Sequence, residues 1–171
     1  LQGATSHDLG QNFGKAFNVT FQNKEGVRDF VWQTSWGAST RMIGALIMAH
    51  SDDGGLVLPP RLAPIHVAIV PIWKNDAEKA QVLEASDKLA RELGADGLVV
   101  KVDDREAMRP GEKYYDWERK GVPLRLEVGP RDVASGTAMG KSRIADSKDK
   151  VKVPFENVGV HVGAILDSLQ K

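Results

Sequence analysis

The sequence predicts an α/β protein in two parts, an antiparallel-sheet part followed by an α/β domain with a mixed five-stranded sheet and three helices. Residues 17–22 and 29–34 alternate around a turn at residues 23–26, which is typical of a hairpin. From Ile65 onward, Val/Ile-rich strand patterns alternate with helical patterns, as in parallel sheets. Between the parts, the proline-rich residues 59–64 predict a stiff connector. We therefore predict two domains, residues 1–63 and 64–171.

Composition limits the class of protein. The chain has 171 residues with 23 basic and 23 acidic side chains, so any RNA contact must come from a local patch. Cysteine is absent, which excludes disulfides within these residues and suits a reducing compartment such as the cytoplasm. No apolar run approaches the roughly 20 residues that span a bilayer, so we expect no membrane partner. The chain begins with leucine, and we expect it to be a piece of a longer protein.

The first part is predicted from spacing and apolar content. Residues 2–17 predict a loop and then a short helix, because Leu9, Phe13 and Phe17 recur at helical spacing. Residues 39–50 predict a helix that is apolar on nearly all sides and is therefore buried. A glycine-rich turn at 51–55 ends this helix, and residues 56–58 predict a short buried strand.

The second part is predicted to contain five strands and three helices. Strands are expected at 65–72, 98–102 and 124–128, with weaker candidates at 137–144 and 151–155 around a charged turn at 146–150. Helices are expected from Asn75 or Asp76 to Gly94, over 112–120 and from Val158 to Leu169. The first two strands and their helix predict a β-α-β unit with a right-handed crossover.

One turn carries a candidate anion site. Residues 33–41 predict a strand end, a small-residue turn and a helix start, where Ser39 or Thr40 caps the first N–H groups and Arg41 adds its charge. Such a helix start favours a phosphate. The alternative is that Arg41 pairs with a surface carboxylate. From spacing alone, His7 can be interpreted as a helix-start residue that bonds to backbone.

Two other motifs are interpreted structurally. Asp52 and Asp53 beside His50 are predicted to be solvated or capping groups, with no metal site. Residues 136–142 (GTAMGKS) have three residues between the glycines where a phosphate loop requires four. This segment is interpreted as a basic strand and turn that faces RNA or solvent.

Three blocks resemble one family. TSWGASTRMIGALIMAHSDDGGLVLPP is similar to motif 3 of class II aminoacyl-tRNA synthetases, in the wording of prolyl-tRNA synthetases. GATSHDLGQNFGKAF and GVPLRLEVGPRD fit the same family in the same order, and the last block leans toward its archaeal and eukaryotic type. The resemblance implies the end of a class II antiparallel-sheet catalytic domain, followed by an anticodon-binding domain.

The resemblance also implies roles in activating proline. ATP would contact Gln2, Thr5, Ser39, Thr40 and Arg41, with Arg41 as the catalytic residue that holds the terminal phosphate. Proline would contact Thr5, His7, Ser35, Trp36 and Gly37, where the indole walls the ring and glycine permits close approach. Mg²⁺ is expected with ATP, and a homodimer is expected for the whole enzyme. Class II motifs 1 and 2 lie outside this sequence, so the chain alone is expected to be inactive.

The resemblance further implies tRNA for proline as partner, bound through Tyr114, Glu118, Arg125, Arg131 and Asp132. Chemically, a tyrosine face stacks on an unpaired base, while a carboxylate and a guanidinium read the edges of guanine. Structural alternatives stay open: Trp117 and one tyrosine pack in the core, and Glu118 pairs with Arg125. The alternative function is a synthetase-like regulatory or tRNA-binding protein without catalysis.

Overall fold

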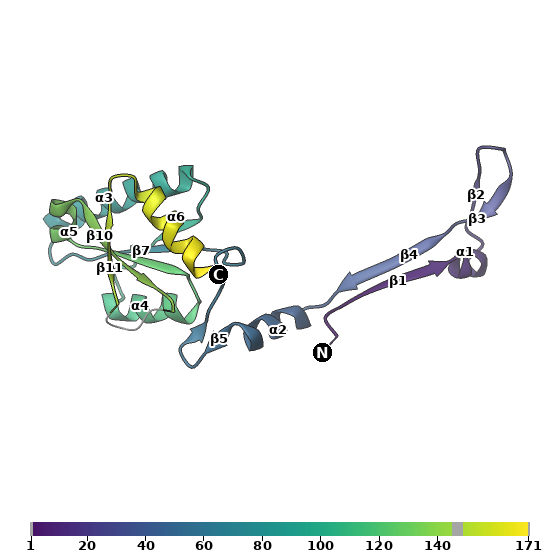
Figure 1. The fold of residues 1–171 in the computed structure, drawn as a ribbon, viewed down its shortest axis with the longest axis horizontal. Helices are drawn as coiled ribbons and strands as arrows, with labels where there is room; N and C mark the ends of the chain where they lie inside the picture. The colour runs from purple at the N-terminus through teal and green to yellow at the C-terminus, as the bar shows by residue number, and fades with distance from the viewer. Residues whose placement is uncertain (1, 145–148, 171) are drawn as a thin grey trace. The chain divides into compact units, whose positions relative to one another are not determined.

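The computed structural model describes residues 2–144 and 149–170 and divides the chain into two compact units, residues 1–49 and 50–171. We call them the N-terminal unit and the sheet unit. Both are drawn in Figure 1. The units divide ahead of the proline-rich connector, and the boundary predicted at residue 63 stays a prediction.

The N-terminal unit is built from two antiparallel strand pairs. Strand β1 pairs with β4, and β2 pairs with β3. The predicted hairpin turn is confirmed, because the Asn23 Oδ1 atom accepts hydrogen bonds from the Glu25 and Val27 amides at 3.0 and 2.8 Å. The elements are β1 (Ala4–Gly10), α1 (Asn12–Ala16), β2 (Thr20–Gln22), β3 (Arg28–Phe30), β4 (Gln33–Ala38) and α2 (Arg41–Ala49).

Two strand predictions in this unit were wrong. Residues 4–10 form a strand where a loop was predicted, so His7 lies inside β1 and does not start a helix. The predicted strand at 29–34 is two strands, of which β3 pairs with β2 and β4 with β1. Small and polar residues have low strand propensity, and pairing with a strand far along the chain overrides that preference.

Helix α2 forms as predicted, but none of its residues is buried. Met42 and Met48 expose 52% and 72% of their surfaces, and Ile43 and Ile47 are exposed too. The prediction of a buried helix is therefore not met within this unit. Apolar composition shows that a helix suits burial, but it does not show which segment covers it.

The sheet unit contains the predicted mixed five-stranded sheet. Its strand order is β11-β10-β9-β7-β8, with β7 parallel to β8 and β9, and β10 antiparallel to β9 and β11. A separate short hairpin, β5–β6, precedes it. The elements are β5 (Ser51–Asp52), β6 (Gly55–Leu56), β7 (Val67–Pro71), α3 (Asp76–Ala95), β8 (Val100–Val102), α4 (Pro110–Arg119), β9 (Leu124–Val128), α5 (Pro130–Ser135), β10 (Thr137–Ser142), β11 (Val151–Pro154) and α6 (Val158–Leu169).

Helix α5 is an addition to the three helices predicted here. Pro130 begins it, the Asp132 carboxylate accepts a hydrogen bond from the Gly129 amide at 2.8 Å, and Gly136 ends it at a φ of 63°. These are ordinary start and stop signals for a helix. The six-residue helix is too short for a periodic pattern to reveal.

Part of the charged turn predicted at 146–150 lies outside the described residues.

The sheet is covered on both faces. Helices α3 and α6 lie on one face and α4 on the other (Figure 1). The larger core joins alternate residues of β7 and β9, such as Ile69 and Leu126, to Leu89 on α3 and Val162 on α6. The opposite residues of β7, Ala68 and Val70, pack under Trp117 of α4. Strand alternation thus turns Arg125 and Glu127 of β9 toward the α4 side.

The start of α3 offers a stability test. The Asn75 side chain accepts a hydrogen bond from the Glu78 amide at 2.9 Å, as an N-cap does. Asn75→Ala should lower the free energy of unfolding by about 1 kcal/mol, measured by urea denaturation. Glu84→Ala, an exposed change within the same helix, is the control and should be nearly neutral. Equal effects of the two changes would contradict a capping role.

Candidate functional site

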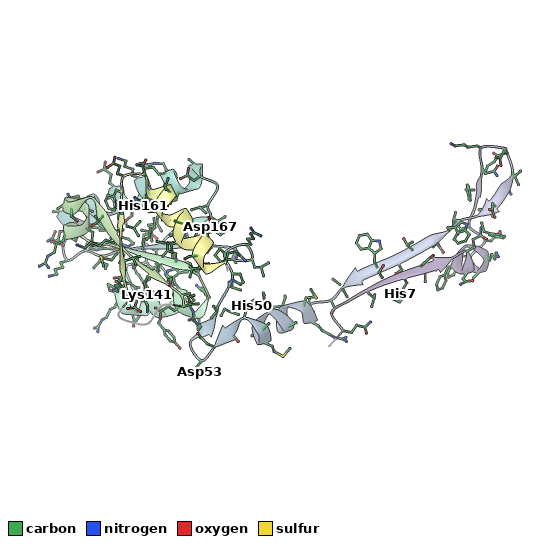
Figure 2. All side chains as sticks on the ribbon, in the orientation of Figure 1. His7, His50, Asp53, Lys141, His161 and Asp167 are labelled. Carbon is green, nitrogen blue, oxygen red and sulfur yellow. The ribbon has the colours of Figure 1, made fainter. Side chains whose placement is uncertain are left out.

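The β1–β4 pair sorts the predicted proline-binding residues onto two faces. Thr5 lies opposite Gly37, and His7 lies opposite Ser35, so these four residues share one face of the pair. Figure 2 labels His7 on β1. Trp36 lies opposite Ser6 on the other face and exposes 79% of its surface. The structure therefore brings together all the predicted proline-binding residues except Trp36.

A hollow of about 310 Å³ lies where β1 and β4 approach the start of α2. Of the predicted ATP-binding residues, all but Thr40 line it. The lining residues are Gln2, Gly3, Ala4, Thr5, Gly37, Ala38, Ser39 and Arg41. Within the part of the chain that the structure describes, no carboxylate pairs with Arg41, which is exposed. A free guanidinium beside a helix start is chemically suited to an anion such as phosphate.

A second group of polar residues lies on the α4 side of the sheet. Helix α4 contributes Tyr114 and Glu118, β9 contributes Arg125 and Glu127, and two lysines come from β10 and from the residue before β11. We call this set the charged cluster: Tyr114, Glu118, Arg125, Glu127, Lys141 and Lys150. Figure 2 labels Lys141.

Arg125 is the centre of the charged cluster. Its Nη1 atom lies 2.7 Å from Glu118 Oε1, and its Nη2 atom lies 3.1 Å from Glu127 Oε1. Its guanidinium carbon lies 4.0 Å from the centre of the Tyr114 ring. Only 5% of Arg125 is exposed. The predicted alternative of a Glu118–Arg125 ion pair is thus present in the structure.

The two lysines give each carboxylate a second partner. Lys141 Nζ lies 3.1 Å from Glu118 Oε1, and Lys150 Nζ lies 2.7 Å from Glu127 Oε2. Three cations therefore face two carboxylates. The Glu118 side chain keeps 33% of its surface exposed, whereas that of Glu127 keeps 8%. A ligand from solvent would thus meet Glu118 first.

Electrostatics fix the protonation of this cluster. Burial raises the pKa of Glu118, but hydrogen bonds from Arg125 and Lys141 outweigh burial and hold the pKa below its usual value. Glu118 is therefore an acceptor at neutral pH. Burial, together with the neighbouring Glu127 carboxylate, raises the pKa of Tyr114 well above its ordinary value, so its hydroxyl stays protonated.

The remaining predicted anticodon residues lie elsewhere. Arg131 is exposed at the start of α5, and Asp132 caps that helix through the Gly129 amide. Trp117 is 6% exposed and donates a hydrogen bond from Nε1 to Asp103 at 2.7 Å, which confirms that it is a core residue. Tyr115 is 64% exposed and lies outside the cluster.

Sequence reasoning missed three members of the cluster, Glu127, Lys141 and Lys150. One signal was available, because β9 reads Leu-Arg-Leu-Glu-Val and places two charges on one face of a buried strand. The lysines carry no such signal. Lys141 reaches the cluster because β10 pairs with β9 so that Lys141 lies opposite Arg125.

Comparison with known proteins decides the family. The model of the anticodon binding domain matches residues 66–162. The chain belongs to the anticodon-binding-domain family. The matched residues contain the charged cluster. The β5–β6 hairpin precedes them.

Relatives extend the likeness to the whole chain. The chain is 51% identical over 171 residues to the proline–tRNA ligase of Porphyromonas gingivalis, with 100% of the chain and 34% of the relative covered. For the same enzyme of Flavobacterium johnsoniae the identity is 52%, with the same coverage. For Roseiflexus castenholzii it is 47% over 173 residues, covering 100% of the chain and 36% of the relative. The chain thus spans about a third of the length of these ligases.

Within residues 2–144 and 149–170, no group of three His, Asp or Glu side chains is placed to hold a metal ion, and we assign no residue to Mg²⁺. Asp52 instead pairs with Arg143 at 2.5 Å. The phosphate-loop look-alike, residues 136–142, contains the whole of β10, a strand without the loop and helix that such a site requires. No helix in the described ranges has the length and apolar content to cross a membrane.

Proposed function

We propose that the chain is the part of a proline–tRNA ligase that completes the prolyl-adenylate pocket and reads the anticodon of tRNA for proline. The observation that carries this proposal is the roughly 50% identity to proline–tRNA ligases across both units. The hollow in the N-terminal unit and the charged cluster in the sheet unit supply matching chemistry. The whole enzyme is expected to be a cytoplasmic homodimer, as the family resemblance implies.

Anticodon reading rests on the charged cluster. The anticodons for proline contain two guanines, whose Watson–Crick edge offers N1–H and N2–H donors and whose other edge offers O6 and N7 acceptors. Glu118 would accept from the donors, and Arg125 would donate to the acceptors. Tyr114 would stack on a base, once a base replaces the guanidinium that now lies on its ring.

The cluster can make this exchange without isolating a charge. When Arg125 Nη1 leaves Glu118, the carboxylate keeps Lys141 at 3.1 Å. Arg125 keeps Glu127, which lies 3.1 Å from Nη2 and 3.3 Å from Nε. Each reading group thus retains one partner, which limits the cost of breaking a buried pair. The Glu118–Arg125 ion pair and base reading by the same residues are therefore compatible.

Proline activation rests on the hollow. A proline carboxylate oxygen attacks the α-phosphorus of ATP, and the bond to pyrophosphate breaks. In the second step, a ribose hydroxyl of the tRNA attacks the adenylate carbonyl and AMP leaves. We propose that Arg41 holds the ATP phosphates, while Gln2, Thr5, Ser39 and Thr40 orient nucleotide and substrate. Mg²⁺, expected with ATP, supplies positive charge on the phosphates when bound.

The proline side of the pocket follows the shared face of β1 and β4. Thr5, His7, Ser35 and Gly37 would face the amino acid. An added side chain at Gly37 meets nothing within 4 Å, which leaves room for a ligand. Trp36 lies on the opposite face of the pair, and its contact with proline stays a prediction.

Arg41→Ala in the whole ligase tests the catalytic half of the proposal. Because Arg41 is exposed, its phosphate contact should contribute about 1.5 kcal/mol, the lower end for a charge-assisted hydrogen bond. We expect a higher KM for ATP and slower ATP–pyrophosphate exchange, with less effect on transfer from preformed adenylate. Exchange kinetics and single-turnover transfer measure the two steps.

Arg28→Ala is the matched control, since Arg28 is an exposed arginine of β3 away from the hollow. Equal loss in both steps for Arg41→Ala would indicate misfolding of α2 and would reject the phosphate role. A whole protein that binds tRNA but shows no exchange at all would favour the non-catalytic alternative.

A further inference from the structure

The β5–β6 hairpin lies against the end of α4, the helix that carries Glu118. A Cβ added at Gly55 would lie 2.6 Å from the Arg119 Cα, and one added at Gly121 would lie 2.6 Å from the Leu56 Cβ. Both glycines have positive φ, 128° and 73°. Backbone therefore packs directly on backbone, which only glycine permits at these positions. The hairpin precedes the matched residues 66–162, yet it is part of the sheet unit.

Arg143 joins this hairpin to α4. Its Nη1 and Nη2 atoms donate to the two oxygens of Asp52 on β5, at 3.0 and 2.5 Å. Its Nε atom donates to the main-chain carbonyl of Glu118 at 2.9 Å. The arginine side chain is 9% exposed. All three donor atoms of the guanidinium thus have partners, on two different elements.

Glu118 is consequently held at two points from the end of β10. Lys141 contacts its carboxylate, and Arg143, two residues later, contacts its carbonyl. The carbonyl lies in the last turn of α4, where it also accepts from the Gly121 amide at 3.0 Å. A cation at a helix C-terminus is favourable in itself. A lysine would satisfy that preference, but only the planar fork of arginine serves the carbonyl and a bidentate carboxylate together.

We propose that Arg143, anchored by Asp52, is a positioning residue for anticodon reading that fixes the backbone of Glu118 and thereby aims its carboxylate at guanine. This inference rests on the proposed function. Hydrogen bonds to a base edge require placement within a fraction of an ångström, so a backbone shift at Glu118 weakens recognition before it unfolds the unit. The β5–β6 hairpin is, on this view, part of the recognition machinery.

The test uses the 171-residue chain and synthetic anticodon stem–loop RNAs of tRNA for proline. In separate RNAs, each anticodon guanine is replaced by inosine, which lacks only the N2 amino donor. The base read by Glu118 is identified first. It is the guanine whose replacement by inosine weakens binding to the unchanged protein but does not change binding to the Glu118→Ala variant. At this base the unchanged protein should prefer guanine over inosine about tenfold, within the range for one base contact.

Arg143→Lys and Asp52→Ala should reduce that preference to about twofold, because they weaken binding of the guanine RNA, which offers two donors to Glu118, more than binding of the inosine RNA, which offers one. Fluorescence anisotropy gives the dissociation constants, and thermal melting of each variant reports folding. Arg91→Ala, an exposed arginine on α3, is the control and should keep the tenfold preference. Asp52→Ala leaves the bond between Arg143 and the Glu118 carbonyl available, so it serves where an Arg143 variant fails to fold.

A merely structural role would lower the melting temperature and weaken both RNAs equally, and that result overturns the inference. A preference that stays tenfold in both variants overturns it as well. Both outcomes leave the proposed function intact. If the unchanged protein and Glu118→Ala show the same preference at every guanine, base reading by Glu118 is wrong, and the proposed function falls together with the inference.

Discussion

Asp103→Ala should lower the free energy of unfolding of the sheet unit by about 3–5 kcal/mol, the usual cost of removing one partner of a buried ion pair. Asp103 is 2% exposed and accepts hydrogen bonds from Trp117 Nε1 at 2.7 Å and from Arg105 at 2.6 and 2.8 Å. Lys113, also 2% exposed, donates to the Asp103 carbonyl at 2.9 Å and lies 4.0 Å from its carboxylate. The alanine variant would remove the acceptor of Trp117 Nε1 and the carboxylate beside the buried Lys113 charge, whereas Lys113 keeps the main-chain carbonyl and Arg105 keeps Asp116.

Urea denaturation followed by circular dichroism measures the change, and Asp104→Ala, at the exposed neighbouring position, is the matched control. Burial raises the pKa of Asp103, but hydrogen bonds from Arg105 and Trp117 outweigh burial and hold the pKa below its usual value. The stabilisation is therefore full at pH values well above the ordinary pKa of an aspartate and is lost as pH falls through the lower folded-state pKa. Asp103→Asn should remove this part of the acid dependence. Equal effects of the changes at 103 and 104 would contradict a buried network.

Periodicity in the sequence was enough to predict most of the sheet unit. The run from Val67 to Val70 predicted a buried parallel strand, and Asn75 predicted the start of the helix that follows. These elements are specified by neighbouring residues, so a single sequence reveals them. Strand β1 was missed because its Ala-Thr-Ser-His segment has little strand preference apart from that of Thr5, and it forms a strand through pairing with β4.

The candidate site was predictable where chemistry resides in one residue and unpredictable where it depends on register. Tyr114, Glu118 and Arg125 were found from the motif that carries them. Glu127 and Lys141 were not, because their contacts depend on which residues of β9 and β10 lie opposite each other. Trp36 shows the same limit, since one residue of register decides which face of β4 it occupies.

Arg125→Ala in the whole ligase should lower kcat/KM for aminoacylation of tRNA by an amount equivalent to about 3 kcal/mol. This is the upper end for one bidentate base contact, because Arg125 is only 5% exposed. Proline activation by ATP should be unchanged, since the hollow of the N-terminal unit lacks this residue. Steady-state aminoacylation and ATP–pyrophosphate exchange measure the two activities. The variant also leaves Glu118 and Glu127 without their shared partner, so some loss of stability is expected.

A comparison of tRNAs separates base reading from this loss of stability. If Arg125 donates to guanine, the unchanged enzyme should discriminate strongly between normal tRNA and tRNA whose anticodon guanines are replaced, and Arg125→Ala should discriminate weakly. Glu127→Gln is the matched control, because it weakens the support of Arg125 and is assigned no base contact. It should lose stability while retaining most of the discrimination. If Arg125→Ala discriminates between the two tRNAs as well as the unchanged enzyme does, the Glu118–Arg125 pair is structural, and Arg125 is not a recognition residue.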